Sequence, residues 1–255
     1  MNFLKAAHTD IGIKKKTNQD SVLIQEASTD YGQVMLAVVC DGMGGLAKGE
    51  VASSTVINAV SEWYKTEFAD ILYEGMDPNS LRISLENFIY RMNEKIQNYS
   101  KANRCSMGTT FVALFVVGDK YYVMNVGDSR VYRIRDSFEQ ITKDQTYVQR
   151  EMDMGRMTPE QAKTDPQRNV LLQCIGASNH IAPDFYTGDV MPNECFLLCS
   201  DGFRHLITPE EFYEYLNPYV ATDEAKMKQA LEYFVDLNKY RHEDDNISAA
   251  LIRTY

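Results

Sequence analysis

The sequence predicts an α+β domain built in layers. Strand-like and helix-like patterns alternate in blocks, without the regular strand-helix-strand repeat of a doubly wound parallel sheet. The chain has 255 residues, of which 44% are hydrophobic, so it can bury a sizeable core. No linker-like stretch divides it, and we therefore expect a single domain over residues 1–255.

Two amphipathic helices are expected first. Apolar residues recur at helical spacing over residues 52–63, followed by a polar and aromatic stretch to about Glu74. A second apolar stripe covers residues 81–96. The turn signal at residues 75–78 separates the two stripes, so these helices should pack antiparallel.

Buried strands follow. Phe111–Val117 is a short, continuous apolar run rich in β-branched and aromatic residues, which is typical of a strand covered on both faces. The pair Gly118-Asp119 predicts a hairpin that returns over residues 121–126, and residues 131–134 form a further strand. Similar strands are expected at 21–25, 35–40, Cys195–Cys199 and 247–252.

The second half also contains helices. Residues 144–169 are polar and helical in pieces, and Thr158-Pro159-Glu160-Gln161 has the residues of a capping box with a first-turn proline. The run from Thr208 to Glu211 repeats this signature. Apolar residues at helical spacing over 227–237 predict one more helix.

Charge and cysteine usage limit the possible functions. Lys plus Arg number 26 and Asp plus Glu 36, and the resulting net charge of −10 argues against nucleic-acid or anionic-membrane binding. No apolar run approaches the ~20 residues of a membrane span, and the N-terminus lacks a signal-peptide pattern. Five scattered cysteines do not form a disulfide framework. We expect a cytoplasmic protein whose cysteines are reduced and buried.

Acidic residues recur at the predicted strand ends. Apolar strands run into Asp41-Gly42, Gly127-Asp128 and Asp201-Gly202, while Asp20 and Asp245 directly precede strands. One Asp-Gly pair is ordinary turn chemistry, but three after buried strands place carboxylates at fixed points where they can converge. Converging carboxylates repel unless a cation lies between them, and Mg²⁺ and Mn²⁺ prefer oxygen ligands.

A glycine cluster, Asp41-Gly42-Met43-Gly44-Gly45, precedes a predicted helix. Its glycines allow the backbone to approach a ligand closely, although a plain flexible turn is the alternative. The cluster is neither a P-loop nor a dinucleotide fingerprint, because Gly-Lys-Ser/Thr and GxGxxG are both missing.

Together these segments resemble the bacterial-type metal-dependent Ser/Thr protein phosphatases of type 2C, the PPM family. The resemblance covers nearly the whole chain, and its motifs occur in the family's order. They are Thr9-Asp10-Ile11-Gly12 with Lys15 and Asn18-Gln19-Asp20; Val39 to Gly45 with Gly49 to Ser53; Met107 to Thr110; Asn125 to Arg130; Arg168 to Leu171 with Ile175-Gly176; Cys199-Ser200-Asp201-Gly202; and Asp245-Asn246-Ile247-Ser248.

The resemblance implies a four-layer αββα sandwich, in which two central antiparallel sheets are flanked by helices, with a two-metal centre at one end. Asp41 would bridge both ions and the Gly42 carbonyl would add a ligand. The remaining metal ligands would be Asp20, Asp201 and Asp245, with Asp128 helping to hold a third, weaker ion.

The implied reaction is hydrolysis of phosphoserine and phosphothreonine in proteins. A metal-bridging hydroxide would attack phosphorus directly, with Mn²⁺ or Mg²⁺ as the ion and no phosphoenzyme. Asp41, Asp201 and Lys15 would carry catalysis, and residues 147–169 would form a mobile flap that shapes substrate choice. The resemblance also implies a signalling role opposite a bacterial Ser/Thr kinase.

The chain departs from the family pattern in three places. Lys15 stands where Arg usually contacts phosphate, and Lys14 and Lys16 flank it, so the phosphate ligand among the three stays open. Gln19 replaces a frequent Glu, and Met43 occupies the place of a His found in many eukaryotic members.

The four histidines lie outside the family motifs, and we expect them at the surface or behind the metal ligands: His8, His180, His205 and His242. One alternative is a catalytically silent member that acts as a regulatory binding module. Another is a phosphatase for a small phosphoester or for an anti-sigma-type regulator. The retained acidic residues favour an active enzyme, because uncompensated carboxylates would destabilise a metal-free domain.

Overall fold

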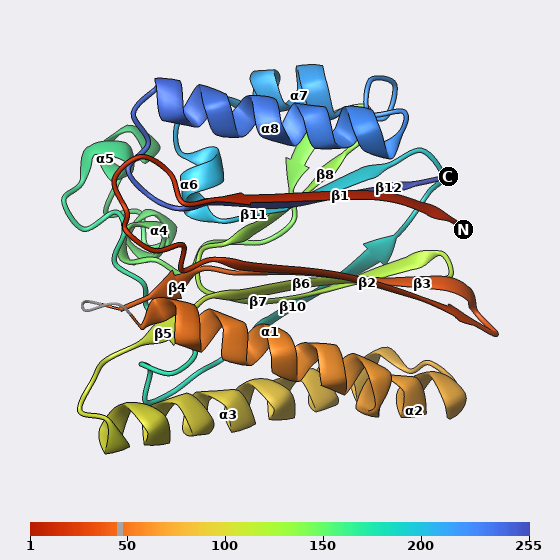
Figure 1. The fold of residues 1–255 in the computed structure, drawn as a ribbon, viewed down its shortest axis with the longest axis horizontal. Helices are drawn as coiled ribbons and strands as arrows, with labels where there is room; N and C mark the ends of the chain where they lie inside the picture. Colours follow the sequence, from red (N-terminus) through yellow and green to blue (C-terminus); the bar gives the residue numbers. More distant parts are fainter. Residues whose placement is uncertain (45–47) are drawn as a thin grey trace.

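A computed structural model describes residues 1–44 and 48–255. It has four layers: two five-stranded sheets face each other, and helices cover the outer face of each sheet (Figure 1). This is the αββα sandwich expected from the resemblance. Gly45, the last residue of the glycine cluster, lies outside the described residues.

The first sheet is antiparallel and contains both ends of the chain. Its strands, in spatial order, are β1 (Phe3–Asp10), β12 (Ile247–Thr254), β11 (Cys195–Cys199), β8 (Arg130–Ile134) and β9 (Phe138–Gln140). The helices α7 (Pro209–Leu216) and α8 (Glu224–Tyr240) lie on its outer face (Figure 1).

The second sheet is also antiparallel. Its strands, in spatial order, are β10 (Asp184–Asp189), β7 (Lys120–Val126), β6 (Phe111–Val117), β3 (Gly32–Cys40) and β2 (Ser21–Thr29). The helices α1 (Gly49–Lys65), α2 (Glu67–Tyr73) and α3 (Pro78–Ala102) cover its outer face, and α1 and α3 run antiparallel as predicted (Figure 1). A small sheet of β4 (Gly42–Met43) and β5 (Gly108–Thr109) lies at one end.

Burial on both faces explains the continuous apolar strands. Along β3, Val34, Leu36 and Val38 pack under the helices, whereas the alternate residues, such as Met35 and Val39, pack between the two sheets. Successive side chains of a strand point to opposite faces, so a strand covered on both sides needs apolar residues throughout. Strands β6 and β11 are fully buried for the same reason.

The predicted helix starts are confirmed. Thr158 and Thr208 both form complete capping boxes, which begin α5 (Pro159–Thr164) and α7. The polar segment before α5 contains the separate helix α4 (Tyr147–Asp153). No helix among residues 1–44 and 48–255 is long and apolar enough to cross a membrane.

Some elements were not predicted. Strands β1 and β10 mix polar and apolar residues irregularly, because both lie at sheet edges and are only partly buried. The four-residue helix α6 (Asp201–Arg204) is too short to show a period. All five cysteines are free, but Cys105 is only half-buried, which corrects the expectation that all five are buried.

Candidate active site

The five predicted carboxylates meet at one end of the sandwich. Asp20 precedes β2 and Asp41 follows β3, and the pairing of Ser21 with Cys40 brings these two residues together. Asp201 and Asp245 adjoin β11 and β12, which are neighbours in the facing sheet. Asp128 follows β7. The prediction that these strand ends converge is confirmed, because all four other aspartates are near enough to raise the pKa of Asp41.

The backbone around Asp41 is fixed on both sides. Its N–H donates to Thr110 Oγ1 at 2.9 Å, and its carbonyl accepts from the Thr110 N–H at 2.8 Å. The next residue, Gly42, passes so close to neighbouring backbone that a Cβ would lie 2.4 Å from the carbonyl oxygens of Gln19 and Gly49. Only glycine fits there, so the chain is held tightly as it leaves β3 and enters the site.

Asp20 and Asp201 each have an oxygen without a partner. Ser200 Oγ donates to Asp20 Oδ2 at 3.0 Å. Asp20 Oδ1 and Asp201 Oδ1 are both buried, and neither accepts a hydrogen bond within the part of the chain that the structure describes. An unsatisfied buried carboxylate oxygen is costly, and a cation satisfies it. The donor set therefore fits hard divalent ions.

The pKa values of the aspartates also indicate a cation site. Burial raises the pKa of Asp20 to about 7, and the charges of Asp201 and Asp245 act in the same direction against hydrogen bonds from two serines. Burial, followed by the charge of Asp20, raises the pKa of Asp41 well above its ordinary value. Across the described residues, no three His, Cys, Asp or Glu side chains are arranged to hold one ion by themselves. Ions here would need further ligands such as water and the Gly42 carbonyl.

Lys15 faces this acidic centre. Its Nζ lies 2.7 Å from Asp245 Oδ1, and 40% of its side chain is exposed. Burial lowers the pKa of Lys15, but the hydrogen bond to Asp245 and the charges of Asp41 and Asp201 outweigh this and raise it. Lys14 is more exposed, at 65%, and pairs with Asp244. Of these two lysines, Lys15 is the one directed to the carboxylates.

The loop that carries Lys15 is held by Asn246. Its side-chain oxygen accepts from the Gln19 N–H at 2.9 Å, and its amide donates to the carbonyls of Ile11 and Thr17 at 2.9 and 3.2 Å. Asn246 thus joins the start of β12 to both ends of the basic loop. The sequence motif contains Asn246, but its spacing gave no sign of this positioning role.

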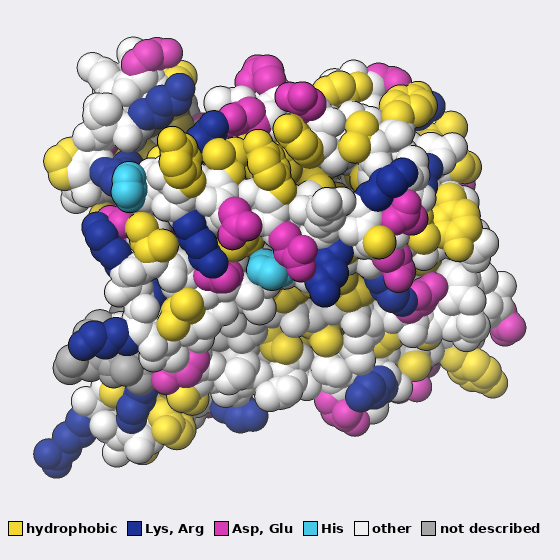
Figure 2. Space-filling model, turned by 45° about the horizontal axis from the view of Figure 1, so that its top comes forward, with side chains coloured by type: hydrophobic (Ala, Val, Ile, Leu, Met, Phe, Trp, Pro, Cys, Tyr) yellow, Lys and Arg dark blue, Asp and Glu magenta, His cyan; other side chains and the backbone are white. Residues whose placement is uncertain are grey.

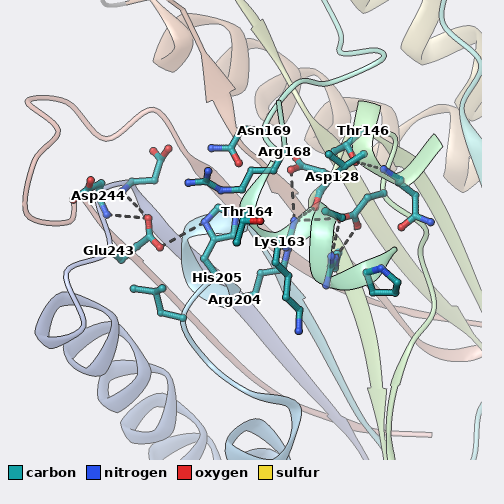
Figure 3. Close-up of a pocket in the computed structure, with 18 of the residues that line it drawn as sticks. Asp128, Thr146, Lys163, Thr164, Arg168, Asn169, Arg204, His205, Glu243 and Asp244 are labelled. Atoms are coloured by element: carbon teal, nitrogen blue, oxygen red, sulfur yellow. Dashed lines mark hydrogen bonds and ion pairs between the residues drawn. The ribbon is translucent and has the colours of Figure 1, made fainter. Parts of the chain in front are cut away.

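A cavity of about 960 Å³ lies beside the centre. Asp128 and Asp245 line it together with residues of the segment that contains α4 and α5, among them Lys163 and Arg168 (Figure 3). Figure 2 shows Lys and Arg side chains gathered around this end of the molecule. The acidic chain therefore has a locally basic rim around its acidic centre.

Two groups lie behind the centre: His205, which was expected at the surface or behind the metal ligands, and Arg204, which was not predicted. The ring nitrogens of His205 lie 3.6 Å from the Asp201 carboxylate and 3.5 Å from that of Glu243, and Figure 3 shows the contact with Glu243. Arg204 contacts Asp128 and Asp144. Burial and the charge of Asp201 raise the pKa of Asp128 to about 7, while Arg204 lowers it. Only the position of Arg204 two residues after Asp201-Gly202 could have indicated it.

The cysteines near the site are poor nucleophiles. Cys40 and Cys199 end strands β3 and β11 and are completely buried. Burial raises the pKa of Cys199 to about 12 and that of Cys40 further still. Neither thiol forms a reactive thiolate near neutral pH.

Comparison with known proteins identifies the family. A family model described as protein phosphatase 2C matches residues 12–236. A putative 2C-type phosphatase of Streptococcus pyogenes is 31% identical over 247 residues, which are 96% of this chain and 94% of that protein. The serine/threonine phosphatase of S. agalactiae has the same fold, with a TM-score of 0.85, 28% identity and 100% coverage of both chains.

A second solved structure contains metal. The catalytic domain of the phosphatase PstP in complex with two manganese ions matches with a TM-score of 0.79 and 29% identity, covering 98% of this chain and 97% of that one. The family match spans most of the chain and includes Asp20, Asp41, Asp128 and Asp201, while Asp245 lies beyond its end. The chain thus belongs to the protein phosphatase 2C family and is a protein-serine/threonine phosphatase.

Proposed function

We propose that this phosphatase hydrolyses phosphoserine and phosphothreonine in proteins with divalent cations held at the acidic end of the sandwich. The proposal rests mainly on two buried oxygens that have no hydrogen-bond partner among the described residues, Asp20 Oδ1 and Asp201 Oδ1. They belong to a cluster that also contains Asp41 and Asp245. These four aspartates and the Gly42 carbonyl would hold the ions. When bound, Mn²⁺ or Mg²⁺ would acidify water and neutralise charge on the phosphoryl oxygens.

Lys15 would bind the phosphate. Its ammonium reaches the centre through Asp245, and the same half-exposed side chain lines the cavity that a substrate would enter. A cation there stabilises the phosphoryl group as its charge shifts during transfer. A lysine presents a point charge, so it supplies attraction without the two-pronged geometry of arginine.

No covalent enzyme intermediate is needed in this proposal. The two thiols that end strands at the site are buried and protonated, which leaves water as the nucleophile. The carboxylates fix the ions, and the backbone around Asp41 keeps that carboxylate in place without reorganisation.

The surroundings of the cavity suggest the substrate class. We assign residues 1–255 to one catalytic domain in which residues 147–169 form the flap. Lys163 and Arg168 on that segment line the cavity, so they can contact acidic groups next to the phosphorylated residue. A cytoplasmic signalling role opposite a Ser/Thr kinase is part of this proposal.

The test is hydrolysis of a phosphothreonine peptide by metal-stripped protein, without metal and then with Mn²⁺ or Mg²⁺. Turnover that appears only with metal is expected. A small phosphoester measured in parallel separates a protein phosphatase from an enzyme with a small substrate. A folded protein that binds Mn²⁺ but hydrolyses neither substrate would contradict the proposal and favour a silent binding module.

A further inference from the structure

Asp128 has a counter-ion with a nearly buried side chain, Arg204, whereas the Lys15 side chain that pairs with Asp245 is 40% exposed. The guanidinium of Arg204 lies beneath Asp128, with Nη2 3.1 Å from the Asp128 carbonyl and 3.5 Å from its Oδ2 (Figure 3). The Arg204 side chain is only 10% exposed. The arginine therefore cannot move into solvent without emptying a buried position.

A second aspartate holds Arg204 in this position. Arg204 Nη2 also lies 3.4 Å from Asp144 Oδ2. Arg130 binds Asp144 from the other side through two bonds of 2.7 Å, in the paired geometry that makes arginine–carboxylate contacts strong. Together, Arg130, Asp144, Arg204 and Asp128 form a buried row of alternating charges that sums to zero.

The cluster of the four other aspartates has a different balance of charge. Among the described residues, Lys15 pairs with Asp245 and His205 lies 3.6 Å from Asp201. Even with both of these groups positively charged, the four carboxylates of Asp20, Asp41, Asp201 and Asp245 leave an uncompensated negative charge, which two divalent ions can offset. Asp128 differs from these four because the Arg204 guanidinium already contacts its carboxylate.

We propose that Arg204 replaces a third metal ion beside Asp128, so that the centre of this chain binds two divalent cations and excludes a third. This rests on the proposed metal centre and refines it. A divalent ion at Asp128 would lie within a few ångströms of a fixed guanidinium, and like charges at that separation repel strongly away from water. Arg204 is thus a positioning residue that sets metal stoichiometry.

The test counts Mn²⁺ ions bound to metal-stripped protein by equilibrium dialysis, with electron paramagnetic resonance of free Mn²⁺ as the readout. Wild type should bind two ions, and Asp128→Asn should still bind two. Arg204→Met should bind a third ion, and the double variant Arg204→Met/Asp128→Asn should return to two. Arg204→Lys keeps the charge and should stay at two.

A control variant tests whether the loss of an unrelated arginine ion pair changes the number of ions bound. Arg82→Met, which removes an exposed ion pair with Glu86 on α3, should not change the count. If wild type binds three ions and Asp128→Asn binds two, the proposed role of Arg204 is wrong, but the metal centre itself is not contradicted. A folded Arg204→Met protein that stays at two would also contradict that role, and if that variant does not fold, the Asp128→Asn count decides. No binding by wild type would overturn the metal centre itself.

Discussion

Strand β11 has a buried acidic residue at each end, and the two residues differ in their ion-pair and hydrogen-bond partners. Glu194, just before the strand, is completely buried, yet it pairs with Arg133 and accepts from the Met191 N–H at 3.2 Å. Asp201, just after the strand, is also buried, and its Oδ1 accepts no hydrogen bond from the described residues.

The difference separates structure from function. A buried acid that serves the fold is placed with its counter-ion, because breaking such a pair is costly. A buried acid that keeps an unsatisfied oxygen destabilises the protein until a ligand provides the missing partner. The end with Glu194 is complete in the chain alone, whereas the end with Asp201 needs an ion.

The largest expected effect is on activity. Asp41→Asn should lower kcat/KM for a phosphothreonine peptide with Mn²⁺ by roughly a thousandfold or more, because it removes charge from the centre of the metal site. The variant should still fold, and without metal it should be at least as stable as wild type. Asp244→Asn, which alters an exposed carboxylate paired with Lys14, is the matched control. Substantial turnover by Asp41→Asn would refute the metal-bridging role.

Substitution of Glu194, at the other end of β11, should lower the stability of the protein instead of its activity. Glu194→Ala should lower the free energy of unfolding by about 2–4 kcal/mol, since it removes a buried carboxylate from Arg133 and Met191. Thermal unfolding measures this, and activity per folded molecule should be retained. Asp189→Ala, which breaks an exposed pair with Lys120, should cost about 1 kcal/mol or less. Equal losses in the two variants would contradict the comparison.

The metal-free protein should become less stable as pH rises. Asp20 has a folded-state pKa of about 7 and the pKa of Asp41 is also raised well above its ordinary value of 3.8, so the folded state holds more protons than the unfolded state above pH 3.8. The stability that these groups contribute is fully present below about pH 3.8 and is lost as pH rises through the folded-state pKa of about 7. We expect the Tm in a chelator to fall by roughly 5–10 °C from pH 5 to pH 8, and Mn²⁺ to remove most of that fall. A Tm in chelator that rises from pH 5 to pH 8 would contradict the conclusion that the carboxylates of the centre are uncompensated without metal.

The smallest effect should distinguish the neighbouring lysines. Lys15→Ala should raise KM for the phosphopeptide several-fold, because Lys15 points to the centre, while Lys14→Ala should change it little. Steady-state kinetics at saturating Mn²⁺ measures both. Equal effects would assign the phosphate contact to the basic loop as a whole.

Much of the fold could be predicted from the sequence. Strands β3, β6 and β11 are covered on both faces, so each is an unbroken apolar run. The edge strands β1 and β10 could not be predicted in this way, because their residues alternate between partial burial and exposure without a clear period. Their place is set by the partners β12 and β7.

The sequence by itself determined which acids would meet, because a rigid buried strand carries its end residue to a fixed point. Asp20, Asp41, Asp201 and Asp245 were found from their strand ends. The tertiary structure alone decided which acids are compensated. Arg204 and Asp128 lie 76 residues apart, and the pairing of β8 with β11 brings them into contact. Compensation depends on distance and burial in three dimensions, and neither is written in the spacing of residues along the chain.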